Sequence, residues 1–150
     1  MEVTEYLNQA YWLEHMIQCR EEDINQLREM SMGISAVQYA ENLFQSENTN
    51  ARFVKLLHKI DEYKLRLLDE LELLVKLKNQ ISEAIKTVPS LRGQAVLQCR
   101  HVQSESWETI ADRFAVSRSS VIRWYKEAVE EVVMPENPIN VYEILQKNKK

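Results

Sequence analysis

The chain is short of the residues that interrupt helices. Among its 150 residues only two are glycine and three are proline, whereas charged residues make up 28%. The chain is rich in Leu, Glu, Lys and Gln, all of which favour the α-helix. This composition excludes a fold built from many tight turns, and we predict an all-α protein.

The chain also lacks the marks of a membrane or secreted protein. No apolar run approaches the roughly 20 residues that a helix needs to cross a bilayer. The first residues, MEVTEYLNQAYW, contain Glu rather than the basic start of a secretory signal. The two cysteines, Cys19 and Cys99, lie far apart in the sequence. We therefore expect reduced thiols and a cytoplasmic protein.

Negative charge dominates the chain but not every part of it. The net charge is −4, which argues against a partner as acidic as nucleic acid. Residues 1–89 contain 10 Lys and Arg against 15 Asp and Glu, and residues 127–150 contain 3 against 5. Residues 90–126, by contrast, contain 6 against 3, which leaves a charge of +3. This asymmetry is typical of a basic nucleic-acid-binding module attached to an acidic scaffold.

Hydrophobic residues at helical spacing predict two long helices, over residues 3–30 and 52–88. The first has coiled-coil spacing, with Arg20 at one seam position and apolar residues at Ala10, Leu13, Ile17, Ile24 and Leu27. The second repeats every seven residues, at Phe53, Ile60, Leu67, Leu74, Ile81 and Val88. We expect its partner seam to consist of Leu57, Leu71 and Ile85, and Pro89 to end it.

We predict that residues 1–88 form a long antiparallel helical hairpin, a coiled coil that also pairs with another chain. Gly33 is expected to end the first helix, a short helix to occupy residues 34–44, and a polar loop to occupy residues 45–50. A two-helix hairpin seldom buries enough apolar surface to be stable alone. We therefore expect a homo-oligomer, either a dimer or a higher assembly.

The pattern after Pro89 predicts shorter helices. Residues 90–103 are expected to form a support helix capped by Ser90, with an inner face of Leu91, Ala95, Val96, Cys99 and Val102. Residues 135–150 are expected to form a C-terminal tail in which Asn140 caps a final short helix.

The stretch 106–132, SWETIADRFAVSRSSVIRWYKEAVEEV, predicts two short helices joined by a tight turn. Ser106 and Ser117 are typical caps, because a serine hydroxyl accepts the unpaired backbone N–H groups of a first turn. The first helix covers Trp107–Phe114, and the second begins at Arg118. The inner residues are predicted to be Ile110, Ala111, Phe114, Val121, Trp124 or Tyr125, and Ala128. We predict a helix-turn-helix inside a DNA-binding domain that covers residues 89–134.

One stripe of the second short helix carries the candidate DNA-contacting residues. They are Arg118, Ser119, Ile122, Arg123 and Lys126, with Ser117 as both cap and phosphate donor. Such cations and hydroxyls read base edges and hold phosphates, and Ile122 is interpreted either as a contact to a thymine methyl or as packing. The alternative for the cations is a solvated helix face. Further candidate phosphate contacts are Arg92, Arg100 and His101.

The sequence gives no support for an enzyme. The three histidines lie on separate predicted elements, and His58 with Glu62 supplies at most half of a metal site. With only Gly33 and Gly93 available, the sequence contains no glycine-rich phosphate loop. We expect no metal and no cofactor.

The segment SLRGQAVLQCRHVQSESWETIADRFAVSRSSVIRWYKEAVEEV resembles region 4 of sigma-70-type factors. The matching residues are Trp107, Glu108, Ile110, Ala111, Phe114, Ser117, Arg118 and Val121. Ala115 departs from that pattern, because such turns usually carry glycine. The upstream sigma regions are absent from this sequence. The order of a helical hairpin followed by this segment is similar to that of phage-encoded transcription regulators of the ArpU/RinA type, which occur in prophages of Gram-positive bacteria.

The resemblance implies sequence-specific binding to double-stranded DNA and activation of phage or prophage late genes in the bacterial host cell, with RNA polymerase as a further partner. Two alternatives remain open. One is a phage small terminase subunit, which would recognise a packaging site and form rings. The other is an interaction module that binds RNA polymerase without reading DNA, and which would keep that activity after loss of Arg118 and Arg123.

Overall fold

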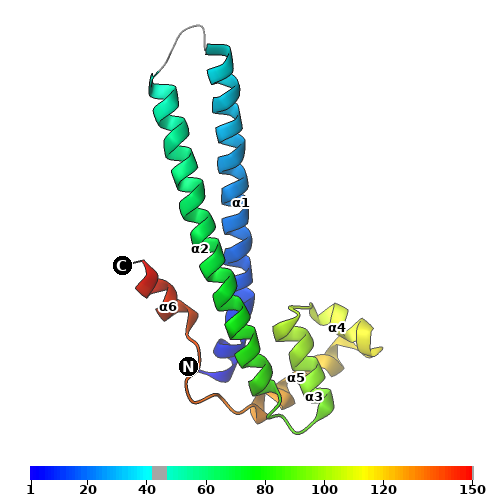
Figure 1. Cartoon of the computed structure of the whole chain (residues 1–150). Coiled ribbons are helices and arrows are strands. Elements are labelled where there is room, and N and C mark those ends of the chain that lie inside the picture. The colour runs from blue at the N-terminus through cyan, green and yellow to red at the C-terminus, as the bar shows by residue number, and fades with distance from the viewer. Residues whose placement is uncertain (42–46, 150) are drawn as a thin grey trace. The chain divides into compact units, whose positions relative to one another are not determined.

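All regular structure in the described chain is helical. A computed structural model describes the backbone of residues 1–41 and 47–149 and the side chains of residues 1–33 and 50–149. In chain order the elements are α1 (Val3–Glu41), α2 (Glu47–Ile85), α3 (Leu91–Leu97), the π-helical turn η1 (Gln98–Val102), α4 (Trp107–Phe114), α5 (Arg118–Glu131) and α6 (Val141–Asn148) (Figure 1). The predicted all-α class is confirmed. Within the described residues, no helix combines the length and the apolarity that crossing a bilayer would require.

The chain divides into two compact units. Unit 1 consists of Met1–Glu14 and Leu73–Lys150, and unit 2 consists of His15–Glu72. One end of the long helix pair belongs to unit 1 together with the shorter helices. The predicted domain boundary after residue 88 stays a prediction. The tail from residue 135 onward also belongs to unit 1.

The two long helices are antiparallel, as predicted. In unit 1, the hydroxyl of Tyr6 donates to Oε1 of Gln80 over 2.7 Å, and Lys78 forms an ion pair with Glu14. In unit 2, Nη2 of Arg20 donates to Oε1 of Glu70 over 2.8 Å. Because residue numbers rise along α1 while those of their partners fall along α2, the helices run in opposite directions.

The ends of the long helices differ from the predicted ones. Gly33 was expected to end the first helix, but α1 continues through it to Glu41. That prediction is wrong. A separate short helix was expected over residues 34–44, but residues 34–41 belong to α1, so this prediction is also wrong for them. Residues 42–46 lie outside the described backbone. Residues 47–50 were expected in a loop and instead form the first turn of α2, which ends at Ile85, before Pro89.

The seven-residue repeat of α2 is confirmed in part, and its partner seam lies one position away from the predicted one. Ile60 and Ile81 of the repeat are buried, whereas Leu57 and Leu71, expected in the partner seam, are 42% and 36% exposed. The prediction is therefore wrong for both leucines, although Ile85 is buried. The buried side chains one position earlier in each repeat are Glu70, Leu77 and Ala84.

Arg20 explains this shift in unit 2. Its guanidinium pairs with the carboxylate of Glu70 and lies 5.3 Å from the centre of the Tyr63 ring. The pairing lets a carboxylate occupy a seam position, where a charge is costly unless a partner compensates it. A pattern that counts only apolar residues assigns the seam to Leu71 instead.

The C-terminal tail is tied to the helix pair by two glutamines of unit 1. The side-chain amide of Gln9 donates to the carbonyl of Ile139 over 2.9 Å and accepts from the amide of Val141 over 2.8 Å. Gln80 acts in the same way, donating to the carbonyl of Asn137 and accepting from the amide of Ile139. These bonds satisfy the backbone of the extended residues that lead into α6. Asn140 caps that helix, as predicted.

Candidate nucleic-acid interface

Serine caps define the starts of α3, α4 and α5, the α-helices of unit 1 that carry the candidate site. The hydroxyls of Ser90, Ser106 and Ser117 each accept a backbone N–H three residues later, at 3.2 Å in every case. All three caps were predicted from the sequence. Replacing such a cap by alanine typically costs about 1 kcal/mol of stability, so the three serines fix where the helices begin.

The turn between α4 and α5 contains a left-handed residue. Ala115 has φ 55° and ψ 43°, and its N–H bonds to the carbonyls of Ala111 and Asp112 at the end of α4. This backbone conformation is natural for glycine and strained for alanine, because the alanine Cβ approaches the following carbonyl. The departure of Ala115 from the sigma-like pattern therefore falls at a position where glycine would be unstrained.

The α4–α5 pair is held by a small apolar core. Val96 and Cys99 from α3 and η1 pack with Ile110 and Ala111 of α4 and with Val121 of α5. Trp107, Phe114, Val116, Trp124 and Tyr125 are partly buried against this cluster. The inner residues predicted for α4 and α5 are thus confirmed, and both Trp124 and Tyr125 pack on the core.

α3 and α5 approach each other closely at Gly93. A Cβ atom built on Gly93 would lie 3.1 Å from Cβ of Ala128 and 3.1 Å from Cγ1 of Val88. Leu91 was expected inside this support helix, but it is 82% exposed, so that prediction is wrong. It precedes the buried Gly93 by two residues, and therefore points to the opposite side of α3. Leu97, which the pattern did not select, is fully buried.

Within unit 1, η1 and the loop after it connect the α4–α5 pair to the N-terminal turns of α1. His101 is buried, its Nε2 lies 2.9 Å from the hydroxyl of Tyr125, and its ring also bonds to the backbone of Leu7. Burial disfavours the imidazolium, and the charge of Arg100 adds repulsion, so that the pKa of His101 falls to about 4. A hydrogen bond from Ser104 to Glu14 ties the following loop to α1.

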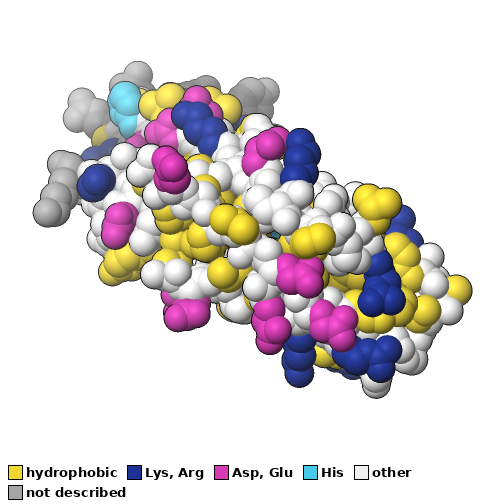
Figure 2. All heavy atoms as spheres, turned by 90° about the horizontal axis from the view of Figure 1, so that it is seen from below, with side chains coloured by type: hydrophobic (Ala, Val, Ile, Leu, Met, Phe, Trp, Pro, Cys, Tyr) yellow, Lys and Arg dark blue, Asp and Glu magenta, His cyan; other side chains and the backbone are white. Residues whose placement is uncertain are grey.

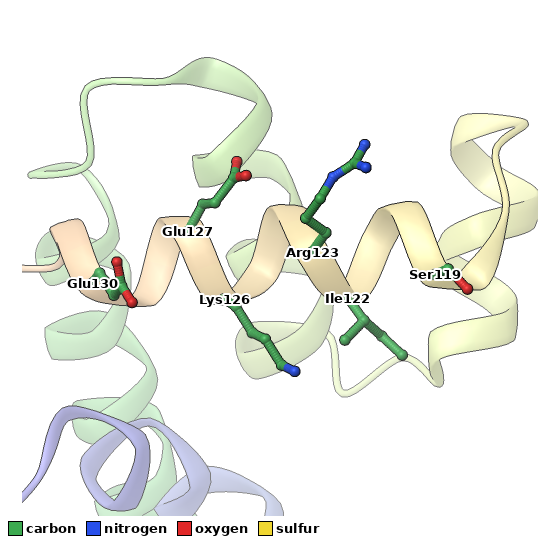
Figure 3. A pocket seen from close by; sticks show the side chains of 6 residues that line it. All are labelled: Ser119, Ile122, Arg123, Lys126, Glu127 and Glu130. Atoms are coloured by element: carbon green, nitrogen blue, oxygen red, sulfur yellow. The ribbon is translucent and has the colours of Figure 1, made fainter.

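The exposed face of α5 forms a shallow groove. The six side chains that line it are Ser119, Ile122, Arg123, Lys126, Glu127 and Glu130. Figure 3 shows them projecting from successive turns, with Arg123 and Glu127 pointing to one side and Ile122 and Lys126 to the other. The structure thus brings together four of the predicted site residues, Ser119, Ile122, Arg123 and Lys126, on one surface.

The cations of this face are available to a ligand. Arg118, Arg123 and Lys126 are exposed, and in the described part of the chain no carboxylate or other group bonds their head groups. Figure 2 shows several Lys and Arg side chains around apolar side chains at the right-hand end of the face drawn, with Asp and Glu beside them. The prediction that these three cations point outward is confirmed; that they contact DNA stays a prediction.

Ser117 and Arg118 lie beside the groove rather than in its lining. The Ser117 hydroxyl accepts from the backbone N–H of Ser120 and lies 2.9 Å from the hydroxyl of the same residue. Its role as a cap is therefore confirmed, whereas its role as a phosphate donor stays a prediction. Arg118 occupies the first turn of α5 with its guanidinium in solvent.

The three additional phosphate candidates have different surroundings. Arg92 is exposed, stacks 4.5 Å from the centre of the Trp124 ring and lies 3.9 Å from a carboxylate oxygen of Glu127. Arg100 stacks 4.1 Å from the centre of the Trp107 ring and donates to a backbone carbonyl. His101 is only 4% exposed. A buried imidazole cannot reach a phosphate, so His101 is withdrawn from the candidate site.

Two groove residues were missed by the sequence analysis. Glu127 and Glu130 follow Arg123 and Lys126 by four residues, and therefore continue the same helical face. Their spacing could have identified them, but a search for cations ignores carboxylates. The groove is consequently basic in its N-terminal half and acidic in its C-terminal half.

Within the described residues, no group of three or more His, Cys, Asp or Glu side chains is placed to hold a metal ion.

Comparison with known proteins adds no relative: no family model matches the chain, and no curated protein or solved structure shows significant similarity to it.

Proposed function

We propose that this protein is a sequence-specific DNA-binding transcription regulator in which α4, its tight turn and α5 form a helix-turn-helix. The observation that carries the proposal is the exposed stretch 118–126 of α5, in which Arg118, Arg123 and Lys126 have no partner in the described chain. An α-helix fits the major groove of B-form DNA, and in helix-turn-helix proteins the N-terminal residues of the second helix meet the base edges.

The order of charges along α5 supports this orientation. Its three cations all precede its carboxylates, which are Glu127, Glu130 and Glu131 at the C-terminal end. Carboxylates are repelled by phosphates, so a duplex is favoured at the N-terminal half and disfavoured at the other. Arg92 and Arg100 are proposed to contact phosphates of the DNA backbone, since phosphate contacts position a protein without reading sequence.

Ile122 gives the proposed interface an apolar element. It is half-buried and lies between Ser119 and Lys126 in the lining of the groove. A branched aliphatic side chain at the base edges suits the methyl group of thymine. We propose this contact in preference to packing within the chain, because Ile122 faces the groove rather than the core cluster.

The resemblance to sigma region 4 and to ArpU/RinA-type regulators extends the proposal to activation of phage or prophage late genes. RNA polymerase is then a second partner. The hairpin order and the serine caps are compatible with this extension, but the proposal of DNA binding does not depend on it.

The test begins with selection of a binding site from random duplex DNA, followed by affinity measurements with Arg123→Ala and Arg118→Ala. We expect each substitution to cost about 1–3 kcal/mol at the selected site. The control is Arg28→Ala, which removes an exposed arginine from α1 of unit 2. Equal affinity of all variants would overturn the proposal.

Site selection, together with light scattering and a polymerase-binding assay, separates the alternatives. A terminase-like packaging function requires a ring of subunits, which light scattering of the free protein would reveal. An RNA polymerase module that does not read DNA would yield no enriched site, while polymerase retention would survive both arginine substitutions. A regulator is supported if the selection enriches one DNA site and the Arg123→Ala variant no longer prefers that site.

A further inference from the structure

A carboxylate lies one helical turn from the central arginine of the groove. Glu127 follows Arg123 by four residues on α5, and Figure 3 shows the two side chains pointing to the same side of the helix. Side chains at this spacing are neighbours and form ion pairs on helix surfaces. Within the described residues, however, no ion pair joins Glu127 to Arg123. The carboxylate nearest to Arg123 along α5 is therefore engaged elsewhere.

The partner of Glu127 is an arginine of a different helix. Nη2 of Arg92, in the first turn of α3, lies 3.9 Å from Oε2 of Glu127. The Arg92 guanidinium also stacks 4.5 Å from the centre of the Trp124 ring. Trp124 is half-buried and packs against the apolar core of the α4–α5 pair, so its ring gives the guanidinium a fixed support.

Two features favour Arg92 over Arg123 as the partner of Glu127. Stacking on Trp124 already restricts the Arg92 side chain, so pairing with Glu127 costs it less conformational entropy than it would cost an unrestrained arginine. Within one helix, moreover, a cation followed by a carboxylate four residues later is the weaker of the two possible orders. Arg123 therefore keeps its donors for a ligand.

We propose that Arg92 is a positioning residue of the DNA-binding site, which holds Glu127 away from Arg123 and compensates its charge beside the groove. Without Arg92, Glu127 is left to pair with Arg123 and to compete with DNA for it. This role rests on the proposed function, and it is separate from a phosphate contact by Arg92. A guanidinium has five N–H donors, so one side of Arg92 pairs with Glu127 while other donors face a phosphate.

The first test compares the effect of Glu127→Gln in two backgrounds, at the DNA site obtained by selection. In the parent, the gain in affinity should be less than about twofold, because Arg92 already compensates the carboxylate. In the Arg92→Ala variant, the same substitution should raise the affinity by about fivefold, since it removes the carboxylate that then occupies Arg123. A phosphate contact by Arg92 alone predicts equal gains. Equal gains, or a smaller gain in Arg92→Ala, overturn the proposal.

The matched control is an exposed arginine–glutamate pair in unit 2. Nη2 of Arg66 lies 2.8 Å from Oε1 of Glu62, and the guanidinium lies 5.9 Å from the centre of the Tyr63 ring. The side chains of this pair are 54% and 58% exposed, against 58% and 60% for the Arg92–Glu127 pair. Arg66→Ala and Glu62→Gln thus change the net charge in the same way. If Glu62→Gln also gains more affinity in the Arg66→Ala background, the effect belongs to net charge and the proposal is overturned.

The second test needs no DNA and therefore separates failure of this inference from failure of the proposed function. The Nε–H signal of Arg123 in heteronuclear NMR spectra of the free protein reports whether its guanidinium is paired. This signal should shift in Arg92→Ala and return to its parent position when Glu127→Gln is added. An unchanged signal overturns the inference even if DNA binding holds. The expected shift, combined with a failure to select any DNA site, would overturn the proposed function but not the pairing of these side chains.

Discussion

Arginine has opposite surroundings in the long helix pair and in α5. In unit 2, Arg20 is mostly buried, and its guanidinium donates to the buried carboxylate of Glu70. On α5, Arg123 is exposed, and its head group has no partner within the described chain. The comparison teaches that a net charge of −4 does not decide whether the protein can bind an anion. What decides it is which cations the fold has already paired.

The buried pair is better suited to fixing register than to adding stability. Nε of Arg20 and Oε2 of Glu70 are buried and have no hydrogen-bond partner. Unsatisfied polar atoms offset much of what the ion pair contributes, whereas any slip of α1 along α2 would separate the two charges entirely. A paired arginine in the seam thus specifies one alignment of the two helices.

The largest expected effect comes from breaking this pair on one side only. Arg20→Met leaves the Glu70 carboxylate buried without its cation, and we expect a loss of about 3–5 kcal/mol in the free energy of unfolding. Denaturant titration followed by circular dichroism measures the loss. Replacing both residues, by Arg20→Met with Glu70→Leu, should recover most of it. A single variant as stable as the parent would show that the pair does not hold the helices.

His101 gives the next largest effect, through pH. Its pKa is about 4 in the folded protein, below the unfolded value of about 6.5. The unfolded chain therefore binds this proton first, and stability is lost as the pH falls from 6.5 toward 4. The loss approaches about 3 kcal/mol at the lower limit. Unfolding titrations across this window should show a shallower decline for His101→Gln.

The control for this pH prediction is His58→Gln, which changes an exposed histidine of α2. It should retain the steep decline of the parent, because His101 is unchanged in this variant. If His101→Gln and the parent lose stability in parallel, the imidazole is not the group responsible.

One alanine lies where glycine would suit the backbone better, and one glycine lies where alanine would. Replacing each by the other residue type should stabilise the protein. Ala115 is left-handed in the α4–α5 turn, whereas Gly33 lies within α1, where an added Cβ meets nothing within 4 Å. We expect Ala115→Gly and Gly33→Ala each to raise the free energy of unfolding by about 1 kcal/mol. Thermal unfolding measures both. A decrease for Ala115→Gly would mean that the flexibility of glycine outweighs the relief of strain.

The smallest expected effect concerns the acidic end of the groove. Glu130→Gln removes a carboxylate four residues beyond Lys126, and it should raise the affinity for DNA of any sequence by less than about tenfold. The gain should shrink as salt concentration increases. The matched control is Glu29→Gln, which removes an exposed carboxylate from α1. An equal gain in the control would assign the effect to net charge rather than to the groove.

The local features of the fold were predictable from the sequence. Ser90, Ser106, Ser117 and Asn140 were identified as caps, because capping depends on a side chain and backbone only three residues apart. The outward direction of Arg118, Arg123 and Lys126 followed in the same way from helical periodicity.

Features that depend on distant partners were not predictable. The buried position of Glu70 requires Arg20 on another helix, and the burial of His101 requires the π-helical turn η1 and the neighbouring Leu7. The docking of the tail by Gln9 and Gln80 likewise involves residues far apart in the chain. Gly33 was misread because a glycine inside a helix costs only about 1 kcal/mol, which does not end α1 before Glu41.

Chemical protection of the selected DNA site by dimethyl sulfate tests the central claim most directly. This reagent methylates N7 of guanine in the major groove and N3 of adenine in the minor groove. If α5 enters the major groove with Arg123 at a base edge, bound protein should protect guanine N7, and Arg123→Ala should lose protection at a defined guanine while Arg28→Ala keeps it. Protection confined to adenine N3, or protection that Arg123→Ala leaves unchanged, would contradict the account.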